Sequence, residues 1–184
     1  MAISDVLVGA PLTGTGGVLR APVGTERPTS AVEPLDPGFV PQGYVGEDGV
    51  TQTVDRSTEK VKAWGGQTVR IVQTDFAATF AFSFLETTDT VLKALHGDDN
   101  VTGSGDDLSV AINAESLPAS AWVFEMKDGD TRLRIVLPNA QVTEVGETTF
   151  SHNAVTARPI TIEALPDEDG NVAYMYKSAI TPGS

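Results

Sequence analysis

Apolar and polar residues alternate over much of this chain, which is the pattern of half-buried β-strands. The clearest run lies between residues 75 and 84, where Phe76, Ala78, Phe80, Phe82 and Phe84 occupy alternate positions. The positions between them are small or polar. A buried phenylalanine contributes about 2–3 kcal/mol, so the four on this face together would contribute several kcal/mol when buried.

Further strands are predicted on both sides of this run. Asp128-Gly129 separates two alternating segments and indicates a hairpin. Its return strand should turn Leu133, Ile135 and Leu137 inward and Arg132 and Arg134 outward. The proline at 159 should make its strand an edge strand or a bulge. The remaining predicted strands are Val18–Ala21, Thr68–Thr74, Leu108–Ile112, Val155–Leu165 and Val172–Lys177.

One short helix is expected over Thr88–Leu95. Thr87 or Thr88 can cap its free amides, and Gly97 can end it. Two polar stretches read as connections between strands: residues 51–66 as a long polar linker, and residues 98–107 as a surface loop. The pattern therefore predicts a mainly β fold with one short helix.

The first 43 residues differ from the rest, because they hold six of the eleven prolines. Proline lacks the amide donor, so this stretch resists helix and central strand. It is either a floppy terminus or an arm that orders against a neighbouring subunit, for which Val18, Leu19, Leu35 and Phe39 would be anchors. The predicted division is an arm over 1–43, a β domain over 44–177 and a polar tail over 178–184.

Composition narrows the function classes. The chain has 184 residues, 12 basic and 25 acidic, for a formal charge of −13. This excess of acidic residues argues against tight binding of DNA or RNA, which needs clustered Lys and Arg. The absence of cysteine excludes disulfides and thiolate nucleophiles. No window is long and apolar enough to suggest a membrane span, and the start does not resemble a signal peptide.

No catalytic constellation is recognisable. His96 and His152 lie in different elements, and no serine sits in a nucleophile elbow. His96 is expected at a helix end, where the dipole favours a cation. The aspartates at 98, 99, 106 and 107 do not have the spacing of a calcium loop. We therefore predict no enzyme activity, no cofactor and no metal.

Several segments in order resemble the major tail proteins of long, non-contractile tailed bacteriophages, especially those infecting actinobacteria. They are residues 47–66, the phenylalanine-rich strand, the helix at 87–97, and residues 120–130, 132–147 and 157–165. The resemblance covers roughly residues 43–177. It implies a β-sandwich or partial barrel of the tail tube type, with one short flanking helix and a long N-terminal arm. The subunits of this family form six-membered rings. These rings would stack into a tube through which DNA leaves the capsid without specific binding.

The resemblance also implies roles and partners. Ring stacking and inter-subunit contacts are assigned to Asp55, Arg56, Glu59 and Trp64, together with the arm residues above. Asp75, Glu125 and Glu163 are candidate acids of the lumen. The implied partners are other copies of the chain, the tape measure, the tail terminator and the tail tip, with no membrane. The protein would be made and assembled in the bacterial host cytoplasm and reside in the virion tail.

The alternative is a monomeric β-sandwich module that binds carbohydrate or another cell-surface ligand. Such a module would use exposed aromatic rings as its binding face, and Trp64, Tyr174 and Tyr176 are the candidates.

Overall fold

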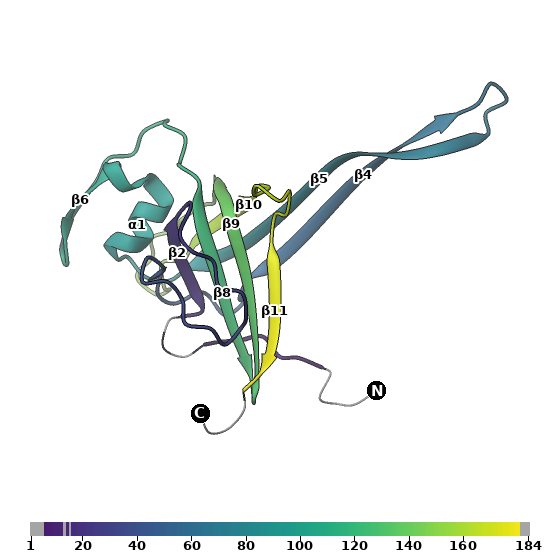
Figure 1. Ribbon diagram of the computed structural model, residues 1–184. Coiled ribbons are helices and arrows are strands. Elements are labelled where there is room, and N and C mark those ends of the chain that lie inside the picture. Colours follow the sequence, from purple (N-terminus) through teal and green to yellow (C-terminus); the bar gives the residue numbers. More distant parts are fainter. Residues whose placement is uncertain (1–5, 13, 15, 181–184) are drawn as a thin grey trace.

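The computed structural model describes residues 6–12, 14 and 16–180, and Figure 1 shows their arrangement. Within these residues nine strands form one sheet, in the order β3-β2-β8-β9-β10-β5-β4. β1 is added beside β8, and β11 beside β9. The strands of this sheet are β1 (Ala10–Pro11), β2 (Val18–Pro22), β3 (Val40–Pro41), β4 (Thr51–Lys62), β5 (Thr68–Phe84), β8 (Ser120–Asp128), β9 (Thr131–Val145), β10 (Arg158–Ala164) and β11 (Tyr174–Ala179).

The other elements lie between β5 and β8. They are α1 (Asp89–His96), a 3-10 turn (Asp98–Asn100), and a separate hairpin of β6 (Val101–Ser104) and β7 (Asp107–Val110). The described part of the chain is thus mainly β with one α-helix, as the pattern predicted. None of its helices combines the length and the hydrophobicity needed to cross a lipid bilayer.

The sheet curls so that β5 packs over β8 although β9 and β10 separate them in the strand order. The rings of Phe80 and Phe124 stack with centroids 5.3 Å apart. Phe82 meets Trp122 edge-on at 6.1 Å. Such aromatic pairs stabilise by about 0.5–1.5 kcal/mol beyond their buried area. The predicted phenylalanine face is confirmed, because Ala78, Phe80, Phe82 and Phe84 all belong to the main core.

A second apolar cluster lies on the opposite side of β8 and β9. It contains Ala121, Val123 and Val136, and it is covered by Leu19 and Phe39 from the N-terminal segment. β2 pairs with β8 from Val18–Phe124 to Pro22–Ser120. Residues 18–41, part of the predicted arm, are therefore built into this chain's own sheet and core. Of the predicted C-terminal tail, residues 181–184 lie outside the described part.

The helix forms where its capping residues predicted it. Thr88 Oγ1 accepts a hydrogen bond from the Val91 amide, at 3.4 Å. The Gly97 amide donates to the Lys93 carbonyl at 2.9 Å, with Gly97 at φ 93°. Val91, Leu92 and Leu95 are buried. The stripe they form is the reason why this short helix is stable against the sheet.

Several local predictions were wrong. Residues 51–62 are not a linker but β4, which pairs with β5 from Thr51–Ala81 to Lys62–Thr68. Residues 98–107 contain part of the β6–β7 hairpin. The strand β10 is not an edge strand, because it lies between β9 and β5. The other predicted alternative, a bulge, has a counterpart in this strand, since its ladder with β9 shifts register between Thr161 and Ile162. The strand tolerates Pro159 because its ladder with β9 begins only at Ile160, so no amide is missed.

Candidate assembly surfaces

The long hairpin, residues 51–77, projects from the body of the molecule (Figure 1). Every residue of β4 is exposed. The tip is closed by hydrogen bonds from the Ala63 amide to the Gln67 carbonyl, 2.8 Å, and from the Gly66 amide to the Ala63 carbonyl, 2.9 Å. At about 3.3 Å per residue, the strand from Asp55 to Trp64 reaches about 30 Å. The projecting part is a two-stranded ribbon, and because isolated ribbons are only marginally stable, a partner surface would stabilise it.

The hairpin carries apolar side chains that have no cover. Trp64 at the tip is 103% exposed, and Val69 and Ile71 are 62% and 61% exposed. All four stacking candidates on this element, Asp55, Arg56, Glu59 and Trp64, are exposed. The Arg56 guanidinium lies 4.7 Å from the centre of the Phe76 ring and donates to Gln73 Oε1 at 3.1 Å. That contact stiffens the base of the hairpin and leaves the distal part free for another molecule.

The N-terminal candidates lie elsewhere. Val18, Leu19 and Phe39 are 1%, 3% and 6% exposed, and Leu35 is half-buried against the second cluster. Their side chains contact this chain's own core, so they present little surface to a neighbour in the described conformation. The hairpin, whose first strand the sequence pattern had suggested only as a polar connection, is the larger exposed element.

Glu125, a candidate lumen acid, is buried in an ion pair with Arg134, which was wrongly predicted to face outward. Arg134 Nε donates to Glu125 Oε1 at 3.1 Å. Arg134 Nη1 donates to the carbonyls of Ser30 and Glu33, each at 2.8 Å. The pair ties the segment over residues 30–33 to the β8–β9 hairpin. We call this arrangement the Arg134 clamp.

Asp75 and Glu163, the other two candidate acids, share one face of the sheet. The register places Glu163 opposite Thr79, and Asp55 opposite Ala77, on the side away from the phenylalanines. Glu144 joins them, because it pairs with Thr161. We call this group, Asp55, Asp75, Glu144 and Glu163, the acidic sheet face. The alternate positions around it over 51–57, 75–83 and 159–163 are small, polar or proline and include no Lys or Arg.

The three aromatic residues proposed as the binding face of a carbohydrate-binding module do not form one surface. Trp64 is at the hairpin tip, whereas Tyr174 and Tyr176 stack on β11 with centroids 6.4 Å apart. The Arg27 guanidinium covers Tyr174 at 3.9 Å, and the Tyr174 hydroxyl donates to Asp167 Oδ2 at 2.7 Å. This hydrogen bond lowers the pKa of Asp167. The tyrosines are thus engaged within the chain and do not offer an open sugar-stacking platform.

His96 gives a pH dependence that differs from the helix-dipole expectation. Burial lowers the pKa of His96 below 6.5, and the nearby charge of Arg158 lowers it further. As pH falls below 6.5, the unfolded chain takes up the proton before the folded chain does, so the free energy of unfolding decreases. We expect the melting temperature to fall between pH 7.5 and 5.5, and to fall less in His96→Asn. Equal slopes in the two proteins would contradict this assignment.

The described residues contain no group of three or more His, Cys, Asp or Glu side chains that could hold a metal ion. The acids at 98, 99, 106 and 107 are spread over the 3-10 turn and the β6–β7 hairpin. The described residues do offer three kinds of surface: the projecting hairpin, the acidic sheet face, and the strand edges of β4 and β11.

Two solved structures resemble the whole chain at low identity. One is the cap that terminates the tube of the anti-feeding prophage, with 13% identity, a TM-score of 0.47, and coverage of 97% of this chain and 100% of that one. The other is from the sheath–tube complex of an extracellular contractile injection system in its extended state. It has 9% identity, a TM-score of 0.45, and coverage of 98% and 99%. Comparison with curated protein sequences gave no match.

The family comparison covers almost the entire chain. The model described as phage tail tube protein matches residues 4–183. This match spans the sheet, the helix and the long hairpin together, so the family applies to the fold as a whole. The chain belongs to the phage tail tube protein family, whose members are structural proteins of the bacteriophage virion.

Proposed function

We propose that this protein polymerises into the tail tube of a long, non-contractile bacteriophage tail, as stacked rings of six subunits around an acidic channel for DNA. The sequence resemblance supports the ring symmetry, the non-contractile tail and an actinobacterial host. Assembly takes place in the host cytoplasm. The tape measure, the tail terminator and the tail tip are the other tail proteins that the tube meets.

The acidic sheet face is the observation that carries this proposal. Its opposite side is the phenylalanine core, so this face is turned outward from each subunit. When copies close into a ring with this face inside, the bore is lined by carboxylates and small polar groups. Carboxylates repel the phosphate backbone, and the missing Lys and Arg remove the groups that would hold it. DNA then passes without being bound.

Free strand edges support ring closure. Within the described residues β4 pairs only with β5, and β11 only with β9. Long exposed edges are aggregation hazards unless another strand covers them. In a cyclic oligomer the same edges pair between neighbours, and the closed ring leaves none free. The long hairpin then extends from each ring toward the next.

Electron microscopy of the concentrated, purified protein tests the proposal. We expect rings or tubes, whose bore is lined by the acidic sheet face in a high-resolution map. We also expect that tubes of the double variant Glu144→Lys, Glu163→Lys retain short duplex DNA at physiological salt, whereas wild-type tubes release it. Only monomers at all concentrations, or a map with these acids on the outside of the tube, would overturn the proposal.

A further inference from the structure

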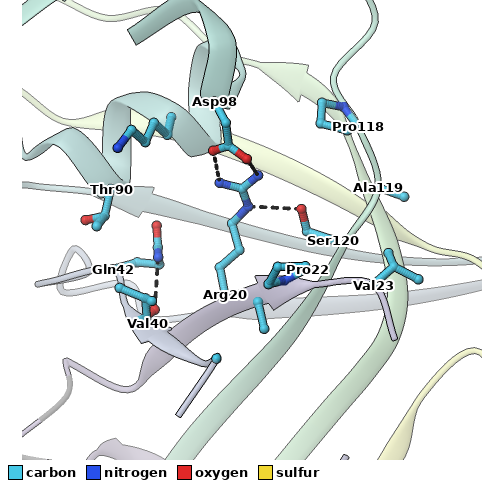
Figure 2. A pocket seen from close by; sticks show the side chains of 13 residues that line it. Arg20, Pro22, Val23, Val40, Gln42, Thr90, Asp98, Pro118, Ala119 and Ser120 are labelled. Atoms are coloured by element: carbon cyan, nitrogen blue, oxygen red, sulfur yellow. Dashed lines mark hydrogen bonds and ion pairs between the residues drawn. The ribbon is translucent and has the colours of Figure 1, made fainter. Parts of the chain in front are cut away.

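A pocket of about 420 Å³ lies beside α1, and Figure 2 shows its lining. Arg20 crosses it, with Nη1 and Nη2 donating to the two carboxylate oxygens of Asp98 at 3.0 and 3.2 Å and Nε donating to Ser120 Oγ at 3.0 Å. The apolar part of the lining comes from Pro22, Val23, Val40 and Pro118. We call it the α1 pocket. Its volume is within the range of about 300–1,000 Å³ that accepts one large organic group.

Gln42 lines this pocket and carries a buried acceptor atom that has no partner among the described residues. The residue is 2% exposed, and its Nε2 donates to the Val40 carbonyl at 2.9 Å. That bond fixes which end of the amide is oxygen. Oε1 has no hydrogen-bond partner in the described structure, and in Figure 2 it points away from Val40, on the side of the pocket where Thr90 lies. A buried acceptor without a partner is unfavourable, so a donor from outside the chain would be strongly preferred there.

Trp64 is the complementary group. It is fully exposed at the tip of the long hairpin. Its indole Nε1–H is a donor only, and it has a large apolar ring that would fit beside Pro22, Val40 and Pro118. Tryptophan is one of the residue types enriched among the anchors of protein interfaces, together with tyrosine and arginine. The hairpin tip and α1 lie on opposite sides of the molecule in Figure 1, so the Trp64 that fills the pocket belongs to another copy.

The charges around the two groups are also complementary. Between residues 56 and 70 the hairpin holds Arg56, Lys60, Lys62 and Arg70 against one carboxylate, Glu59, in a chain of charge −13. Around the pocket, the cations are already paired: Arg20 with Asp98, and Lys93 with Asp89 at 3.2 Å. Residues 94–126 contain no Lys or Arg but five acids between 98 and 115. Of these acids, Asp98 lines the pocket and Asp99 follows it in the chain, so the basic tip would meet carboxylates at this rim.

We propose that Trp64 of one copy inserts into the α1 pocket of another, with its indole N–H donating to Gln42 Oε1. Because the two surfaces are at different ends of the molecule, the contact is head-to-tail and repeats in one direction. Lys60, Lys62 and Arg70 border the acids at residues 98 and 99. This inference rests on the proposed self-assembly and names the surface that receives the hairpin.

Tryptophan fluorescence tests the insertion directly, because the chain has only two tryptophans and Trp122 is buried in the core. On assembly of the wild-type protein, we expect the Trp64 emission to shift to shorter wavelength and to become protected from acrylamide. If the protein assembles but Trp64 remains open to the quencher, the inference fails while the proposed function stands. If nothing assembles, the proposed function itself fails.

Three variants separate the contribution of the Trp64 indole ring from that of its N–H donor. Trp64→Ala should raise the concentration needed for assembly about 30-fold or more, as for other interface anchors. Trp64→Phe keeps an aromatic ring without the N–H, and Gln42→Met removes the acceptor at similar length. Each substitution should raise the concentration needed for assembly by less than Trp64→Ala does. The double variant Trp64→Phe, Gln42→Met should need no higher concentration than either single variant. Fully additive effects in proteins with unchanged melting curves would overturn the pairing.

Cross-linking gives an independent readout, since the chain has no native cysteine. A mixture of Lys62→Cys and Thr90→Cys proteins should form covalent dimers with a short thiol cross-linker in the assembled state. Lys62→Cys with Lys177→Cys, on β11 away from the pocket, is the matched control. Efficient linking of the control pair and none of the first pair would place the tip elsewhere.

Discussion

Removal of the distal hairpin abolishes tube formation and leaves the subunit folded. The variant replaces residues 57–75 with Asn-Gly, which joins Arg56 to Phe76. These two residues already face each other across β4 and β5, and Asn-Gly favours the tight turn that such a pair needs. The removed residues are exposed except for the half-buried Val72, so little core stability is lost. Sedimentation velocity and negative-stain microscopy should show only monomers, or unstacked rings, at concentrations where the wild type makes tubes.

A full-length control separates hairpin length from its surface chemistry. Replacing Val61, Trp64, Val69 and Ile71 with threonine keeps the β-propensity of the strands but removes the exposed apolar groups. This protein should also fail to stack. Tubes formed by the shortened chain at wild-type concentrations would show that the hairpin is dispensable. A shortened chain that loses its cooperative melt would show that the hairpin is part of the folded core.

Glu125→Ala should destabilise the subunit more than any surface substitution. It leaves the Arg134 guanidinium, whose side chain is 3% exposed, without its carboxylate partner. Breaking a buried ion pair by removing one partner costs about 3–5 kcal/mol. This is a large part of the free energy of unfolding of a typical domain, which is about 5–15 kcal/mol. The free energy of unfolding from urea titration gives the measurement.

Matched variants show whether burial is the cause. Glu125→Gln keeps an acceptor oxygen for Arg134 Nε and should lose less stability than the alanine variant. Lys93→Ala breaks the half-buried Asp89–Lys93 pair on the helix surface and should change stability by only about 0.5 kcal/mol. We also expect amides near Ser30 and Glu33 to exchange faster in Glu125→Ala, because their carbonyls are held by Arg134. A loss under 1 kcal/mol would mean that the clamp contributes little.

The elements that sequence reasoning predicted best are those whose own side chains enforce the structure. The phenylalanine strand and α1 have strong periodicity and, for the helix, both caps, so local pattern and burial agree. β4 lacked such a signal. Polar residues occupy both of its faces along most of its length, and its extended form depends on pairing with β5, which no pattern within residues 51–62 can reveal.

Strand alternation also predicted some residues of the candidate surfaces and missed others. Asp75 and Glu163 were proposed from strand alternation, and the register places them on one face. Glu144 was missed because the register shifts in this part of the β9–β10 ladder, which changes the simple alternation. Glu125 looks outward by alternation, but the N-terminal segment covers that side of β8. A cover supplied by residues about a hundred positions away leaves no trace in the local sequence.

The strand β5 has a mechanical consequence. It runs without interruption from the exposed tip at Thr68 to the buried Phe84, and its inner part pairs with β10 from Ala78–Ala164 to Phe84–Arg158. A pull on the tip along the strand axis therefore loads these backbone hydrogen bonds in shear, all at once, instead of peeling them one by one. In a fibre whose subunits are joined through these tips, tension would therefore act on each subunit in the direction in which its sheet resists unfolding best.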